Sequence, residues 1–127
     1  MLLERCISGV DRLVKQAKLL ANGSRKIIVV GAILPTIADD SIATQENPLR
    51  RSIAATQMER TQLVLAYNYR LAAYAAAERL DYFDMTEQTI SPATGVVDHR
   101  YLALAEDHHL SHPATGQMWA EQLKALL

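Results

Sequence analysis

Two short hydrophobic runs, one on either side of a long helical segment, most constrain the fold of this chain. The first is Lys26–Val30, in which β-branched residues follow one another with no polar residue between them. Such a run is typical of a strand that is covered on both faces in a parallel sheet. The second run, Leu80–Asp84, resumes the strand pattern directly after the helical segment. This order predicts two parallel neighbours with a right-handed crossover, each buried on both faces.

Three helices are expected around these strands. Residues 2–20 carry apolar side chains at three- and four-residue spacing, which is the pattern of an amphipathic helix. Residues 51–79 are rich in alanine, which favours helix and permits close approach to a sheet. A proline near its start favours a last helix over residues 113–127. The segments 36–50 and 85–112 are polar: the first predicts a loop at the carboxyl end of the first strand, and the second an extended stretch.

The fold class that follows is α/β, a partial three-layer α/β/α sandwich with a small parallel sheet. Two strands make a poor sheet, because each outer edge is left unpaired and a stable parallel sheet normally has more members. The sequence therefore predicts a single domain over residues 1–127 that is a piece of a larger α/β domain. The alternative is a domain whose sheet is completed by a partner segment or by a homo-oligomer.

Composition excludes several classes of function. Half of the 127 residues are hydrophobic, 21% are charged, and the formal net charge is −1, so nothing calls for nucleic acid or an anionic membrane. The longest apolar run is far short of the roughly 20 residues that span a bilayer. A single cysteine, Cys6, forms no internal disulfide, and charged residues occupy the place of a signal peptide's apolar region. A cytoplasmic location is expected.

The candidate functional residues lie in a short acidic and histidine-rich turn before the last helix. The turn contains Glu106, Asp107, His108 and His109. A carboxylate close to an imidazole can fix the ring's orientation and tautomer, which is what the base of a nucleophile–His–acid triad requires. Glu106 or Asp107 is the candidate acid and His109 the candidate base.

A metal site is an alternative interpretation of this turn. The ligand types for zinc are present in a group of histidines and acids: His99, His108, His109 and His112 with Asp98, Glu106 and Asp107. Pro113 argues against a helix that would hold His108 and His112 on one face, and the spacing fits no known zinc pattern. No metal and no cofactor is therefore expected. A solvated turn without chemistry is the remaining alternative.

A series of features in fixed order carries a resemblance to a known family. They are the Ile27–Val30 strand running into Gly31 and Pro35, the helix with Glu59-Arg60, Asn68 and Leu71, the Leu80–Asp84 strand, Gly95–Asp98 with Arg100-Tyr101, and Asp107–Ser111 followed by Gly116 and Trp119–Glu121. Together they resemble the C-terminal half of the SGNH (GDSL-type) hydrolases over nearly the whole chain. The resemblance implies a flavodoxin-like SGNH fold and ester hydrolysis with His109 as base.

The resemblance leaves two residues as the acid of the triad. In the family the acid stands three residues before the histidine, which falls on Glu106. Asp107, two residues before, is the more usual acid chemically, and some relatives end in an Asp-His-His-Leu turn. Asp107 is slightly favoured, and both residues remain candidates.

The family's other catalytic blocks are missing from this sequence. Its nucleophilic serine lies in a Gly-Asp-Ser turn after the first strand, and a glycine and an asparagine complete its oxyanion hole. Here Ser8 falls in a helix and Ser24 in a helix-ending turn. The expectation is the C-terminal part of an SGNH-like esterase or acylhydrolase, acting on a small-molecule or carbohydrate ester once an N-terminal segment completes it. The alternative is a non-catalytic interaction or structural domain derived from that fold.

Overall fold

The two predicted strands are neighbours in a parallel sheet. The computed structural model describes residues 2–21, 23, 25–104 and 108–127. Within these residues the sheet has two strands, β1 (Ile28–Val30) and β2 (Asp81–Phe83), which run parallel with Val29 beside Tyr82. The predicted strand positions and their parallel pairing are confirmed.

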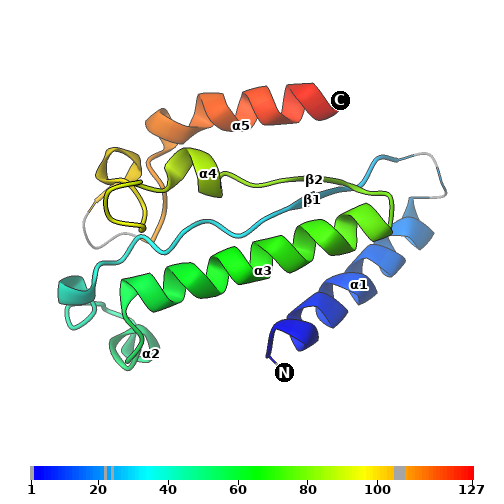
Figure 1. Ribbon diagram of the computed structural model, residues 1–127. Coiled ribbons are helices and arrows are strands. Elements are labelled where there is room, and N and C mark those ends of the chain that lie inside the picture. Colours follow the sequence, from blue (N-terminus) through cyan, green and yellow to red (C-terminus); the bar gives the residue numbers. More distant parts are fainter. Residues whose placement is uncertain (1, 22, 24, 105–107) are drawn as a thin grey trace.

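Helices cover the two faces of this sheet, which makes a three-layer arrangement (Figure 1). Helices α1 (Leu2–Leu20) and α3 (Gln57–Ala77) lie on one side of the strands, and α5 (His112–Leu126) lies on the other. On the first side a core of Val29, Leu71 and Ala75 joins β1 to α3, and side chains of α1 pack against it. On the second side Phe83 of β2 meets Trp119 of α5 edge to face, with ring centroids 5.2 Å apart. None of the described helices is long and apolar enough to cross a bilayer.

The long helix begins later than its sequence predicts. We expected a helix from residue 51, but residues 48–51 form a separate short helix, α2 (Pro48–Arg51), and α3 starts at Gln57. Thr56 fixes that start, because its hydroxyl accepts from the N–H of Glu59 while the Glu59 carboxylate accepts from the N–H of Thr56. This capping box satisfies the backbone N–H groups of Thr56 and Glu59, which in a continuous helix would donate to carbonyls of the preceding turn.

The prediction that both strands are buried on both faces is wrong for β1. Val29 is buried against the helices, whereas Val30, which points to the opposite face, exposes 39% of its surface. Its neighbour in β2, Phe83, is buried because Trp119 covers it. The described part of the chain thus leaves the β1 side of the sheet incompletely covered.

The polar segments are more structured than predicted. The segment after β1 contains a 3-10 turn at Asp39–Ser41 in addition to α2. The segment after β2 contains a short helix, α4 (Thr86–Thr89), and a 3-10 turn at His99–Tyr101. Isolated antiparallel bridges, Ile90 with Val97 and Leu102 with Leu110, close its turns. These local contacts carry the chain from β2 to the start of α5.

Candidate functional site

His109 lies beside a mostly apolar cavity of about 480 Å³ near the carboxyl end of β1. Ile33 enters the cavity from the segment that follows β1, and Trp119 enters it from α5. The remaining lining residues come from the turn before α5 and its first turns: Leu110, His112, Thr115 and Gly116. The carboxyl ends of parallel strands are the usual ligand-binding edge of an α/β sheet. The structure places the predicted base at this edge.

Backbone hydrogen bonds fix the position of His109 relative to α5. The N–H of Ser111 donates to the carbonyl of Tyr101 at 2.6 Å, and Leu110 is bridged to Leu102. Ser111 is also the N-cap residue of α5. The histidine is therefore held at the junction between a bridged turn and a helix, although its own side chain is exposed.

The two adjacent histidines have different surroundings. Their rings stack with centroids 3.8 Å apart and planes tilted by 43°. Arg50 of α2 lies with its Nη1 atom 3.0 Å from Nδ1 of His108. Because a guanidinium only donates, Nδ1 of His108 must accept, which places the proton of a neutral His108 ring on Nε2. His108 is thus tied to α2, whereas His109 lines the cavity together with His112 of α5.

Both candidate acids, Glu106 and Asp107, lie outside the described residues. Their assignment stays a prediction. His99, from the rejected metal group, lies in the 3-10 turn that follows α4. No group of three or more potential ligands is close enough to hold a metal ion in the ranges that the structure describes.

The hydroxyl that lines the cavity is already engaged. Thr115 is buried, and its Oγ1 donates to the backbone carbonyl of Ser111 at 2.9 Å. This is a common hydrogen bond between a helical threonine and the preceding turn, and it directs the proton away from any imidazole. Ser8 lies within α1 as expected, and Ser24 is not among the described residues. The geometry of Thr115 does not make it a nucleophile for His109.

A buried asparagine fixes the segment that brings Ile33 to the cavity. Asn68 of α3 accepts from the N–H of Ala32 through Oδ1 at 2.8 Å, and its Nδ2 donates to the carbonyl of Ala32, also at 2.8 Å. The asparagine satisfies both backbone groups of a residue just beyond β1. The sequence signal for this role was a polar side chain within a buried face of α3, three residues before Leu71.

Asp84 organises the end of β2 through hydrogen bonds. Its carboxylate accepts from the hydroxyl of Tyr82 at 2.5 Å, from the N–H of Thr86 at 2.8 Å, and from the hydroxyl of Thr86. Burial favours the neutral form of Asp84, but the hydrogen bonds from Thr86 and Tyr82 outweigh it, so the pKa of this carboxyl lies below its ordinary value of 3.8. The pKa of the Tyr82 hydroxyl is raised, mainly by burial and to a smaller extent by its hydrogen bond to Asp84.

Replacing Asp84 with Asn should therefore reduce the dependence of stability on acid pH. A carboxyl with a lowered folded pKa stabilises the fold above its unfolded pKa, near 3.8, and this contribution is lost as pH falls through the folded pKa. The thermal midpoint of the wild type should fall more steeply below about pH 4 than that of Asp84→Asn. Tyr82→Phe, which removes one donor, should give an intermediate slope. Parallel slopes in all three proteins would contradict this.

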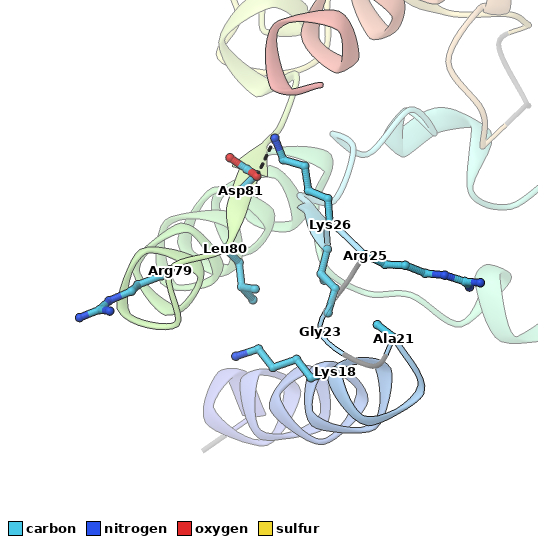
Figure 2. A pocket seen from close by; sticks show the side chains of 9 residues that line it. Lys18, Ala21, Gly23, Arg25, Lys26, Arg79, Leu80 and Asp81 are labelled. Atoms are coloured by element: carbon cyan, nitrogen blue, oxygen red, sulfur yellow. Dashed lines mark ion pairs between the residues drawn. The ribbon is translucent and has the colours of Figure 1, made fainter.

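A second cavity, of about 310 Å³, lies at the opposite end of the strands and carries several basic residues (Figure 2). Lys18 is paired with Glu78 at 2.9 Å, and Lys26 is paired with Asp81 at 3.2 Å. The side chains of Arg25 and Arg79 point away from each other (Figure 2). Their charges do not converge on one point, so this cavity is not assigned as an anion site.

Comparisons with known proteins show the fold of the chain. No protein-family model matches it, and no curated protein matches it in sequence. A solved structure of a "putative acylhydrolase" from Bacteroides fragilis matches 98% of this chain and 53% of its own chain, with a TM-score of 0.64 and 19% identity. A GDSL-like lipase from Bacteroides thetaiotaomicron matches 89% of this chain and 48% of its own, with a TM-score of 0.60 and 18% identity.

These two proteins are about twice as long as the part that the chain matches. At this level of identity the likeness concerns architecture alone. The chain spans about half the length of the two solved proteins and has the α/β fold, with a small parallel sheet, of part of a GDSL-type (SGNH) hydrolase domain.

Proposed function

We propose that this chain supplies the histidine side of an ester-hydrolysing active site, with His109 as general base. The observation that supports this most directly is the place of His109, at a cavity beside the carboxyl end of β1. The fold around it is shared with an acylhydrolase and a lipase of GDSL type. The apolar lining from Ile33, Leu110 and Trp119 suits the acyl part of an ester, either a small molecule or an acylated carbohydrate.

We place the nucleophile on another polypeptide segment, because Thr115 is the one hydroxyl residue among the described residues that line the cavity and its hydroxyl is directed to a backbone carbonyl. In the proposed reaction His109 takes the proton of that segment's serine as the serine oxygen attacks the ester carbonyl. The alcohol then leaves with the proton from His109, which leaves an acyl-serine. Water attacks the acyl-serine with His109 again as base, which releases the acid and restores the serine.

Asp107 is the proposed acid, and Glu106 is the alternative. The acid would accept from the second nitrogen of the His109 ring and so fix the tautomer that can take a proton. In a protein completed by a Gly-Asp-Ser segment, Asp107→Asn should lower kcat by about 10²–10⁴, whereas Glu106→Gln should lower it by less than about threefold. The reverse pattern would assign the acid to Glu106. A loss in neither variant would contradict the triad.

A non-catalytic interaction domain is the second candidate. It is favoured by the exposed position of His109 and by several large apolar side chains that remain exposed on α1 and β1. A completed protein that folds, carries the Gly-Asp-Ser segment and still shows no esterase activity on short acyl esters would favour this candidate over the enzyme.

A further inference from the structure

We infer that the free edge of β1, together with one apolar face of α1, is the docking surface for a polypeptide that carries the half of the fold this chain lacks. That polypeptide would add a strand parallel to β1. The inference names the partner of the proposed active site, and the direction of the added strand rests on that proposed function. The existence of the docking surface rests on the fold alone.

The sequence of β1 is not that of a natural sheet edge. Soluble proteins usually protect an edge strand with charged residues, proline or a bulge. β2 contains one such charged residue, Asp81, at its start. The residues of β1 are Ile28, Val29 and Val30, with no charge among them, and Val30 exposes 39% of its surface. The sequence of β1 is therefore typical of an interior strand, and we expect another strand to pair with its outer edge.

The backbone geometry shows which groups of β1 face this edge. In a parallel ladder the N–H and C=O of one residue point to the same side, and those of the next residue point to the other. The N–H of Gly31 donates to the carbonyl of Phe83 in β2 at 2.9 Å. By alternation, the backbone groups of Ile28 and Val30 point away from β2. Asn68 occupies those of Ala32, so the ladder available to a further strand lies within β1.

One face of α1 carries further exposed apolar side chains. Leu2, Leu13 and Leu20 are separated by eleven and seven residues, which are about three and two helical turns, so they share one face. They expose 65%, 66% and 83% of their surfaces. A different face of α1, which includes Ile7 and Val10, packs against the core that contains Val29. α1 is therefore apolar on two faces, and the structure covers one of them.

The solved relatives in fold indicate what covers this surface. Nearly all of this chain matches about half of the Bacteroides fragilis protein, so the other half of that fold has no counterpart here. A parallel strand beside β1 would end near the cavity and bring its following loop to His109. A second copy bound through the same edge about a two-fold axis would normally run antiparallel and would bring its amino end there. The missing half of the fold is therefore the assigned occupant.

Amide hydrogen exchange tests the inference at single residues. The 127-residue chain would be measured alone at several concentrations, and then with the polypeptide encoded in frame immediately upstream of Met1 at the natural locus. In the mixture we expect a 1:1 complex in which the Val30 amide exchanges at least 100-fold more slowly than in the chain alone. The amide of Gly31, which is already bonded to Phe83, should change less.

A matched pair of variants tests the face of α1. Leu13 and Leu19 lie on the same helix and expose 66% and 78% of their surfaces, but only Leu13 is on the face shared with Leu2 and Leu20. Leu13→Lys should weaken the complex at least tenfold, measured by titration calorimetry, while Leu19→Lys should leave the affinity unchanged. Both variants should keep the circular dichroism spectrum of the wild type, because neither side chain is buried.

Several results would overturn the inference. They are the lack of an in-frame upstream polypeptide, an encoded polypeptide that does not bind, a complex in which Val30 stays unprotected, and equal effects of the two lysine variants. Protection of Val30 in the chain alone as its concentration rises would assign the edge to a second copy instead. His109→Ala should leave the complex and the protection of Val30 intact. If the unmodified chain forms the complex and protects Val30 but shows no esterase activity, the proposed function is rejected and the docking surface is retained.

Discussion

Gly31→Ala should destabilise the fold by about 3 kcal/mol, the upper part of the range for overpacking a tight site. Gly31 follows β1 directly and lies against β2 and α3. A Cβ atom built at this position would lie 2.5 Å from Cβ of Asp84, 2.6 Å from the hydroxyl oxygen of Tyr82 and 3.1 Å from Cγ of Asn68. The Cβ of Asp84 is bonded directly to the backbone, so no side-chain rotation relieves this contact.

Gly9→Ala is the matched control for this substitution. Gly9 lies in the middle of α1, and a Cβ atom there would meet nothing within 4 Å. Alanine should therefore stabilise the chain by roughly 0.5–1 kcal/mol through its higher helix propensity. The free energy of unfolding in urea, followed by circular dichroism, distinguishes the two variants. A change of less than about 0.5 kcal/mol for Gly31→Ala would show that β1 and β2 are not packed as described.

The secondary structure was largely predictable because local sequence determines it. The β-branched run before Gly31 and the spacing of apolar residues over 2–20 specify a strand and a helix without help from distant residues. The start of α3 was missed because propensity over residues 51–56 favours helix weakly, whereas the Thr56 capping box fixes the boundary. The exposure of Val30 could not be predicted from the hydrophobic segment that contains it, because burial depends on which other strands are present.

The candidate site was predictable only in part. The turn that holds His109 was identifiable from its residue types, and the structure places it at a cavity. The contacts that shape this cavity join residues far apart in the chain, such as Asn68 with Ala32 and Arg50 with His108. Such pairs leave no periodic signal in one sequence. The buried position of Asn68 was the one local indication of its role.

His109→Ala should abolish most of the activity of a completed protein. Removal of the general base should lower kcat for p-nitrophenyl acetate by about 10²–10⁴ and leave the residual rate that oxyanion donors and binding provide. His108→Ala is the matched control, because His108 is tied to Arg50 and stacks on His109 without lining the cavity. It should change kcat by less than about threefold. Equal losses in the two variants would show that His109 has no special role.

The most direct test of the account is the rate of p-nitrophenyl acetate hydrolysis at neutral pH by four preparations. They are the 127-residue chain, its His109→Ala variant, the chain completed by a segment with a Gly-Asp-Ser turn, and that completed protein with His109→Ala. We expect equal rates from the first two, because the chain has the base but not the nucleophile, and a large increase in the third that His109→Ala removes. Robust turnover by the chain alone that depends on His109 would contradict this account and place a nucleophile within these residues, and sensitivity of that turnover to a chelator would indicate a metal.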